Sequence, residues 1–289
     1  MVRPVVTIDD LVGPNRDPDS IKHAMGQLAT LSARYEAFLE SEEEPPRADG
    51  IHASEISYCT RRIAYSISLP RPKKKVTPFW RRKFSAGHMV HNWLQNDFTR
   101  FAEASGQTIH FEREVKISPK TRALAARWGV YSSCDGIFSL RGPDGRETTR
   151  AIVEIKTASK DEFAKLKEPE PAHIEQAHVY MAALNIPFVW FFYWNKDNHT
   201  HTSSAHESFL NAYDPYLWSG LEERFQAAHD TVSRGELPPK QEGFHCELCV
   251  WGSVCKPDYL APRVRSMSDL VEEATRRRPP RQAKKGPKS

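Results

Sequence analysis

The sequence contains no long apolar run. Nowhere in its 289 residues is there a stretch approaching the roughly 18 uninterrupted apolar residues of a membrane-spanning helix, and Met1–Pro4 do not begin an apolar signal-peptide core. A Walker-type G-x-x-x-x-G-K motif is missing as well, so any ATP-driven motor would be another chain. We therefore expect a cytoplasmic protein that makes no membrane contact.

Cysteine is also scarce. Five cysteines are an awkward number for disulfides in a reducing cytosol. At about 150 residues per domain the chain has room for one large or two modest domains, and either buries a core without covalent staples. Metal or redox chemistry is thus the expectation for these cysteines.

The basic charge is concentrated in two segments. The chain has 41 Lys and Arg against 37 Asp and Glu; seven cations and no acid lie in Arg71–Lys83, and seven more cations follow from Arg276 onwards. Without these segments 27 basic residues remain against 37 acidic ones, so the rest of the chain is acidic. Such clusters attract polyanions through counterion release, although basic runs are also common as solvated surface or flexible tail. Charge alone leaves both interpretations open.

The spacing of apolar residues predicts a mixed α/β fold. An amphipathic helix is expected from Ser20 to Leu39, with its apolar stripe packed on the protein rather than on a partner helix. Leu69–Trp80 is expected to be an exposed loop and Arg141–Gly145 a hairpin turn. Phe188–Trp194 is continuously apolar, which favours a buried central strand. Further helices are predicted over residues 57–67, 85–104, 172–184 and 217–234, and strands over 109–117, 130–140 and 148–157.

The strand around Glu154 carries the first candidate site. Because side chains alternate along a strand, Glu154 and Lys156 share one face, while Val153 and Ile155 point to the opposite, buried face. Asp135, on the preceding strand of the hairpin, can reach the same place across the ladder. Two carboxylates suit Mg²⁺ or Mn²⁺. The ammonium suits the negative charge that develops in a phosphoryl transition state. The alternative is a surface salt bridge, but Asp135 stands in an apolar strand, where a carboxylate is costly unless it binds something.

Two helical segments add polar side chains. His173, Gln176 and Tyr180 are spaced i, i+3, i+7 and share one face of a helix. Upstream, His88 and His91 lie in another predicted helix, so one of the two shares a face with Leu94 and Gln95. A lone helical histidine is more often an ordinary surface or core residue, but these neighbours favour a functional role here.

These motifs resemble the PD-(D/E)XK nuclease superfamily in its RecB-like branch. A G-x-x-x-H element (Gly87, His91), Asp135, the E-x-K strand and a Q-x-x-x-Y helix occur in the family order. The resemblance implies a restriction-endonuclease-like fold, a mixed central sheet flanked by helices, over residues 50–262, between an N-terminal extension, 1–49, and a basic, disordered tail, 263–289. It selects His91 over His88. It also implies that Mg²⁺ or Mn²⁺ is held by His91, Asp135, Glu154 and the carbonyl of Ile155, and that the catalytic residues are Asp135, Glu154, Lys156, Gln176 and Tyr180.

Four of the cysteines extend the resemblance. Cys246, Cys249 and Cys255 supply three soft ligands within ten residues, and Cys59 or the adjacent His245 is the candidate fourth. Cys59 is preferred because consecutive residues ligate one metal with difficulty. The pattern is similar to the iron-sulfur nucleases of the AddB and CRISPR-associated Cas-four type, which implies a [4Fe-4S] cluster on Cys59, Cys246, Cys249 and Cys255, in a subdomain formed by segments before and after the core. Zinc is the alternative occupant, and Cys134 is expected to be a small buried residue.

The resemblance implies a metal-dependent DNA exonuclease that hydrolyses phosphodiester bonds at single-stranded ends, in recombination, repair or processing. The alternative is a DNA-binding or processing subunit of a larger complex, for CRISPR adaptation or beside a helicase, with little catalysis of its own. DNA is the expected partner, and a helicase, recombinase or integrase the expected class of protein partner. A phage-encoded member would work in a bacterial or archaeal host cell. The expected contacts to backbone phosphates are Arg61, Arg62, Lys73, Lys74, Lys75, Arg81 and Arg82.

Overall fold

The computed structural model describes residues 30–41, 47–57, 59–72, 76–197, 205–241 and 249–255, together with Asp19, Lys22, Gly26, Gly243 and Cys246. The chain divides into two units: Met1–Pro45 with Lys74–Ser85, and Pro46–Lys73 with Ala86–Ser289. The predicted boundaries after residues 49 and 262 stay predictions. Outside the described residues lie Lys73, Lys74 and Lys75, the alternative ligand His245, and the tail 263–289.

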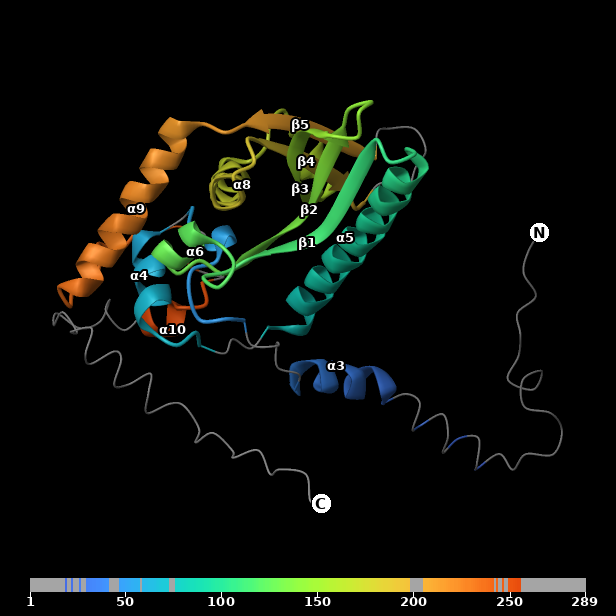
Figure 1. Ribbon diagram of the computed structural model, residues 1–289. Helices are drawn as coiled ribbons and strands as arrows, with labels where there is room; N and C mark the ends of the chain where they lie inside the picture. The colour runs from blue at the N-terminus through green and yellow to red at the C-terminus, as the bar shows by residue number, and fades with distance from the viewer. Residues whose placement is uncertain are drawn as a thin grey trace, which may run out of the picture. The chain divides into compact units, whose positions relative to one another are not determined.

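The second unit contains one five-stranded mixed sheet (Figure 1). Its strands lie side by side in chain order: β1 (Ile109–Ile117), β2 (Ser132–Arg141), β3 (Glu147–Ala158), β4 (Phe188–Asn195) and β5 (His206–Ala212). All neighbouring pairs are antiparallel except β3 and β4, which are parallel. The connection between these two strands contains α7 (Lys160–Phe163) and α8 (Pro171–Leu184). The mixed α/β prediction is therefore confirmed, including β4 as an internal strand.

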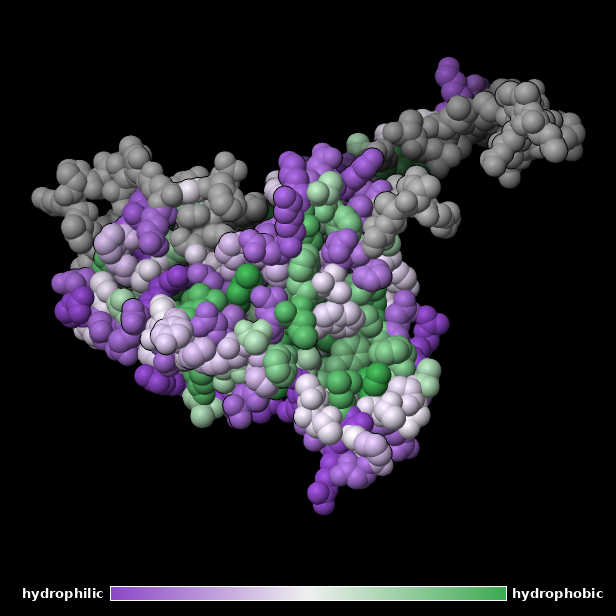
Figure 2. Space-filling model, turned by 90° about the horizontal axis from the view of Figure 1, so that it is seen from above, coloured by the Kyte–Doolittle hydropathy of each residue, from purple (hydrophilic) through white to green (hydrophobic). Residues whose placement is uncertain are grey.

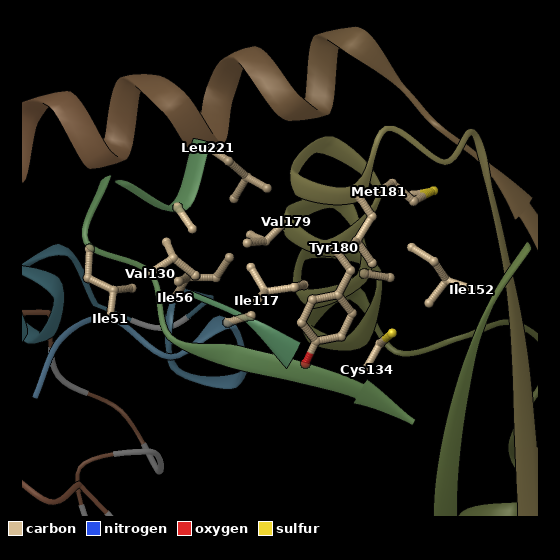
Figure 3. Close-up of a cluster of buried hydrophobic side chains, with 14 of the residues drawn as sticks. Ile51, Ile56, Ile117, Val130, Cys134, Ile152, Val179, Tyr180, Met181 and Leu221 are labelled. Carbon is tan, nitrogen blue, oxygen red and sulfur yellow. The ribbon is translucent and has the colours of Figure 1, made fainter. Parts of the chain in front are cut away.

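Helices cover both faces of this sheet. On one face, Leu94 and Phe98 of α5 (Pro78–Ala104) are buried in a cluster with Val153 and Ile155 of β3. On the other face a larger core includes Ile152 and Val179 (Figure 3). This second core is closed by α8 and by η1 (Ala53–Glu55), α4 (Thr60–Ser68), α6 (Ala123–Trp128) and α9 (Pro215–Ser233). The burial of Val153 and Ile155 on one face leaves Glu154 and Lys156 on the other, as the alternation predicts.

Local sequence explains where several elements begin and end. Pro171 begins α8 at a position where its missing N–H costs nothing, and Asn185 ends it with a left-handed φ of 54°. Asp214 caps α9 by accepting from the backbone N–H groups of Tyr216 and Leu217. The predicted loop Leu69–Trp80 is wrong in its last residues, because α5 begins at Pro78, where proline is again tolerated at the first helical position.

The first unit is described over α3 (Leu31–Ser41) and the start of α5, Pro78–Ser85. An ion pair of 2.7 Å joins Arg82 to Glu36. Of the predicted apolar stripe, Leu39 is buried, whereas Tyr35 and Phe38 are 55% and 54% exposed. The packing of this stripe on the rest of the protein stays a prediction.

Hydrophobic residues at the surface lie in patches between hydrophilic ones on the face drawn in Figure 2. None of the described helices is both long and apolar enough to cross a membrane.

Candidate active site

The sheet is interrupted at Asp135. The pairing of β2 with β3 ends at Gly136 and Val153, and one residue further on the Oδ2 atom of Asp135 accepts the backbone N–H of Ile155 at 2.7 Å. On the other side, the pairing of β1 with β2 omits Glu114, the residue opposite Asp135, and Glu114 has a φ of +51°. A positive φ is uncommon for a residue with a side chain and clusters at functional sites. Asp135 therefore stands where β2 separates from β3 and where one pair is missing from the ladder between β1 and β2.

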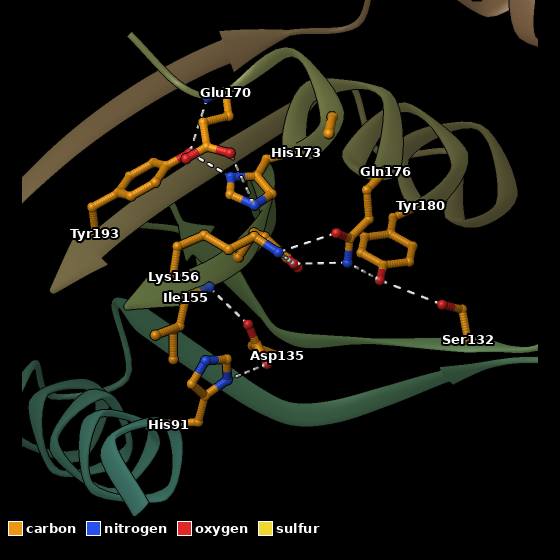
Figure 4. Close-up of polar contacts among 12 residues, drawn as sticks. His91, Ser132, Asp135, Ile155, Lys156, Glu170, His173, Gln176, Tyr180 and Tyr193 are labelled. Atoms are coloured by element: carbon orange, nitrogen blue, oxygen red, sulfur yellow. Dashed lines mark hydrogen bonds and ion pairs between the residues drawn. The ribbon is translucent and has the colours of Figure 1, made fainter. Parts of the chain in front are cut away.

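His91 contacts the other oxygen of this carboxylate. Its Nδ1 atom lies 2.9 Å from Oδ1 of Asp135 (Figure 4), whereas His88 is exposed. Burial alone would lower the pKa of His91, but the hydrogen bond and the charge of Asp135 raise it above its ordinary value of 6.5. The pair therefore favours a protonated imidazole that donates to Asp135, which places His91, and not His88, at the site.

Glu154, Lys156 and Gln176 form one hydrogen-bonded group beside this pair (Figure 4). The Nζ atom of Lys156 lies 2.7 Å from Oε1 of Glu154 and donates to Oε1 of Gln176 at 3.1 Å. The Nε2 atom of Gln176 donates to Oε1 of Glu154 at 2.9 Å. The predicted convergence of β3 and the Q-x-x-x-Y helix is thus present in the geometry.

The carboxyl group of Glu154 is held in an unfavourable environment. It is 3% exposed, and this burial raises its pKa to about 7 even though the Lys156 ammonium acts in the opposite direction. The charge of Asp135 raises it further. The charge of His91, like that of Lys156, acts in the opposite direction and lowers it.

Tyr180 and His173 support the group from α8. The Tyr180 hydroxyl accepts from Nε2 of Gln176 at 2.7 Å, and Ser132 lies 3.4 Å from it. Burial raises the pKa of Tyr180 well above 10, so it remains a neutral phenol. His173 turns instead to the hydroxyl of Tyr193, 2.8 Å away, and burial followed by the charge of Lys156 lowers its pKa to about 3. His173 is therefore neutral, and its hydrogen bond to Tyr193 joins α8 to β4.

The donor set suits a hard divalent cation, with two carboxylates, an imidazole and the carbonyl of Ile155. Within the described ranges, however, no three His, Cys, Asp or Glu side chains are gathered around one point as metal ligands. The oxygens of Asp135 bind His91 and the Ile155 N–H, and Oε1 of Glu154 binds Lys156 and Gln176. A metal ion would have to exchange some of these hydrogen bonds for coordination bonds.

The cysteines lie in two segments that are joined to each other. Thr60, at the start of α4, donates its backbone N–H to Gln241 at 3.0 Å, and Arg61 donates to the carbonyl of Pro238 at 2.7 Å. Burial raises the pKa of Cys249, and the nearby thiols of Cys255 and Cys59 act in the same direction. Cys249 is therefore near both the upstream Cys59 and the downstream Cys255.

Two buried N–H groups near these cysteines lack an acceptor. Nε of Arg62 and Nε1 of Trp251 have no hydrogen-bond partner in the part of the chain that the structure describes. Cys249 and Cys255 pack on the cluster that contains Trp251, and the charge of Arg62 acts on Cys249. Unpaired donors beside thiols fit a site for an anionic, sulfur-rich group. Cys134, in contrast, is 1% exposed in the main core, as predicted.

The predicted DNA contacts have varied surroundings. Arg62 forms a 3.0 Å ion pair with the buried Glu55, and Arg61 binds Pro238 as described. Arg81 and Arg82 lie near the start of α5, where Arg82 pairs with Glu36. Their roles as phosphate contacts stay predictions.

Sequence reasoning assigned no role to Gln95, which lies one helical turn after His91. It is 0% exposed and donates to the carbonyl of Asp135 at 2.9 Å. The i, i+4 spacing from His91 was the available indication, but the contact depends on how α5 crosses the interrupted sheet.

Comparisons with known proteins find similar folds only. No family model matches the chain, and no curated protein matches its sequence. Among solved structures, the crystal structure of SSO0001 is 15% identical, with a TM-score of 0.42, and covers 82% of this chain and 98% of its own. An alkaline exonuclease, LHK-Exo, from Laribacter hongkongensis is 16% identical, with a TM-score of 0.43, over 74% of this chain and 96% of its own. The same exonuclease in complex with dAMP is 15% identical, with a TM-score of 0.44, and the match covers 74% of this chain and 95% of that chain. At such scores the activity has to be inferred from the side chains.

Proposed function

We propose that this protein is a divalent-metal-dependent deoxyribonuclease that hydrolyses phosphodiester bonds at single-stranded DNA ends. The observation that carries the proposal is the position of Glu154 and Lys156 on one face of β3, in contact with Gln176 of α8 and beside Asp135, at the point where β2 and β3 separate. Buried carboxylates next to an oriented ammonium are the groups that phosphodiester hydrolysis requires.

The residues have distinct roles in this proposal. His91, Asp135, Glu154 and the carbonyl of Ile155 would hold Mg²⁺ or Mn²⁺, which supplies Lewis-acid stabilisation of the phosphate and a more acidic attacking water. Lys156 neutralises charge that develops on the phosphate and orients the water. Gln176 accepts from the ammonium at 3.1 Å and so fixes where it points. Since Tyr180 remains neutral, it contributes a hydrogen bond and not a charge.

The second part of the proposal concerns the cysteines. Cys59, Cys246, Cys249 and Cys255 would hold a [4Fe-4S] cluster, which joins the segment before the sheet to the segment after α9. The proximity of Cys249 to Cys59 and to Cys255 and the unpaired donors of Arg62 and Trp251 support it. Zinc is the competing occupant, and metal analysis separates the two.

The activity is tested with end-labelled DNA. Purified protein is incubated with 5′- or 3′-labelled single- and double-stranded DNA and Mn²⁺, with EDTA in a parallel reaction. We expect Mn²⁺-dependent release of short products from single strands, and loss of release in Asp135→Ala. The matched control is Asp161→Ala, because Asp161 is an exposed carboxylate of α7. Degradation by Asp135→Ala at the parental rate would refute the assignment.

The rival function is a DNA-binding subunit with little catalysis of its own. Both oxygens of Asp135 and Oε1 of Glu154 are engaged in hydrogen bonds, which is compatible with that role. Binding of labelled DNA by the parental protein, without cleavage at any Mn²⁺ concentration, would favour it over the nuclease.

A further inference from the structure

The side chain of Gln95 binds a strand carbonyl beside a missing pair of the sheet. Next to Asp135 the ladder between β1 and β2 omits Glu114, whose φ of +51° turns its backbone away from ordinary strand geometry. The carbonyl of Asp135 instead accepts Nε2 of Gln95 at 2.9 Å. A side chain of α5 thus satisfies the carbonyl of Asp135 at the residue where the ladder omits a pair.

The chemistry of its partners fixes the orientation of this amide. Oε1 of Gln95 faces an NH2 donor of Arg113 at 3.0 Å, and a guanidinium can only donate. The Nε2 group faces two acceptors, the carbonyl of Asp135 and the carboxylate of Glu114, both at 2.9 Å. All three of these contacts require the amide as it stands, so its reversal would place acceptor against acceptor and donor against donor.

The position of Gln95 is also fixed by the packing of α5 around it. It is 0% exposed, next to Leu94 and one turn before Phe98, both of which are buried in the core between α5 and the sheet. Arg113 makes a second hydrogen bond, to Asn96 on the same helix, at 2.6 Å. A fully satisfied buried amide on a packed helix is a rigid support.

We propose that Gln95 is a positioning residue, which fixes the backbone of Asp135 so that its carboxylate stays aligned with His91 and the Ile155 N–H. The proposal rests on the proposed nuclease function for its catalytic consequence. Asp135 is held at three points: Oδ1 by His91, Oδ2 by Ile155 and the backbone carbonyl by Gln95. A metal ion that takes over the carboxylate leaves the bond to Gln95 intact, so this contact persists in the working site.

The test is Gln95→Met, which keeps an unbranched side chain of similar size and removes both donors. We expect kcat for labelled DNA to fall about 10- to 100-fold, the usual effect of removing a group that orients a metal ligand, and the Mn²⁺ concentration for half-maximal rate to rise. Gln95→Glu is the second variant, because it keeps the acceptor for Arg113 while placing an acceptor against Asp135 and Glu114; it should lose activity in the same way.

The control is Phe98→Leu, one turn further along α5, which weakens the same core without touching Asp135. It should lower stability while keeping the parental kcat and Mn²⁺ requirement. If Gln95→Met and Gln95→Glu also keep the parental kcat and Mn²⁺ requirement, Gln95 is only a structural residue and the proposal is overturned.

Crystal structures of the parental protein and Gln95→Met separate this inference from the proposed function. We expect the Asp135 carboxylate of the variant to be displaced by more than about 0.5 Å, the tolerance of a functional constellation. An unmoved carboxylate overturns the positioning role. If the parental protein does not cleave DNA, the proposed function fails, and the two crystal structures alone decide the role of Gln95.

Discussion

Replacing Glu154 by glutamine should stabilise the protein while removing its activity. The Glu154 carboxyl has an ordinary pKa of 4.5, and burial raises it to about 7 in the folded state. The folded state therefore holds a proton that the unfolded chain has already released, and the free energy of unfolding falls as the pH rises from about 4.5 to about 7. At about 1.4 kcal/mol per pH unit, this difference amounts to about 3 kcal/mol.

Glutamine does not ionise, so it removes this pH-dependent loss of stability. Its amide oxygen can still accept from Lys156, and Lys156 keeps its bond to Gln176 at 3.1 Å. In EDTA at pH 8 we expect Glu154→Gln to be more stable than the parental protein by about 3 kcal/mol, or roughly 6–12 °C in Tm. At pH 5 the difference should shrink to less than about 1 kcal/mol.

The assay is urea unfolding of both proteins at pH 5 and pH 8, under anaerobic conditions. Glu55→Gln is the matched control, because Glu55 is a carboxylate of similar burial, 6% exposed. Burial raises its pKa, but the hydrogen bond from Arg71 and the charges of Arg62 and Arg71 outweigh this and leave the pKa lowered. The stabilisation that ionised Glu55 contributes is present above the pKa of this carboxyl in the unfolded chain, so Glu55→Gln should be destabilising at pH 8. Equal stability of Glu154→Gln and the parental protein at pH 8 would refute the account of the Glu154 carboxyl.

Two further predictions concern the sheet interruption and the cysteines. A Cβ at Gly136 would lie 2.9 Å from the carbonyl oxygen of Glu112 and too close to the Cε2 and Cζ atoms of Phe111. Gly136→Ala should therefore destabilise the fold by about 1–3 kcal/mol and lower the nuclease rate, as measured by thermal unfolding and the DNA assay; an unchanged Tm contradicts this close approach. Anaerobically purified protein should contain about four iron atoms per chain, and Cys59→Ser should lose them while Cys134→Ser keeps them; zinc in the parental protein would rule out the cluster.

Much of the fold is predictable because its elements carry strong local patterns. The strand predicted over 109–117 is β1, and the helix predicted over 172–184 is α8 within one residue. β5 was not predicted, because the edge strand His206–Ala212 is largely exposed and its apolar residues do not alternate in a way that marks a buried face. The short helix α6 was also missed, since six residues provide too few turns for a periodic pattern.

The motifs indicate which residues form the candidate site, but not the protonation of Glu154 or the contacts of Gln95. Motif spacing selects His91 over His88, and the structure brings His91 to Asp135. The raised pKa of Glu154 could not be predicted, because burial arises only when α8 packs over β3. The role of Gln95 depends in the same way on tertiary structure: the missing pair of Glu114 and Asp135 in the ladder between β1 and β2 has no counterpart in the amino-acid pattern.

The central claim is that Lys156 and its carboxylate neighbours hydrolyse DNA. The most direct measurement is the rate at which Lys156→Ala degrades labelled single-stranded DNA in Mn²⁺, compared with Lys160→Ala, which removes an exposed lysine four residues further along the chain. We predict that Lys156→Ala loses the activity and that Lys160→Ala keeps the parental rate. Parental activity in Lys156→Ala, with the same Mn²⁺ dependence, would contradict the account.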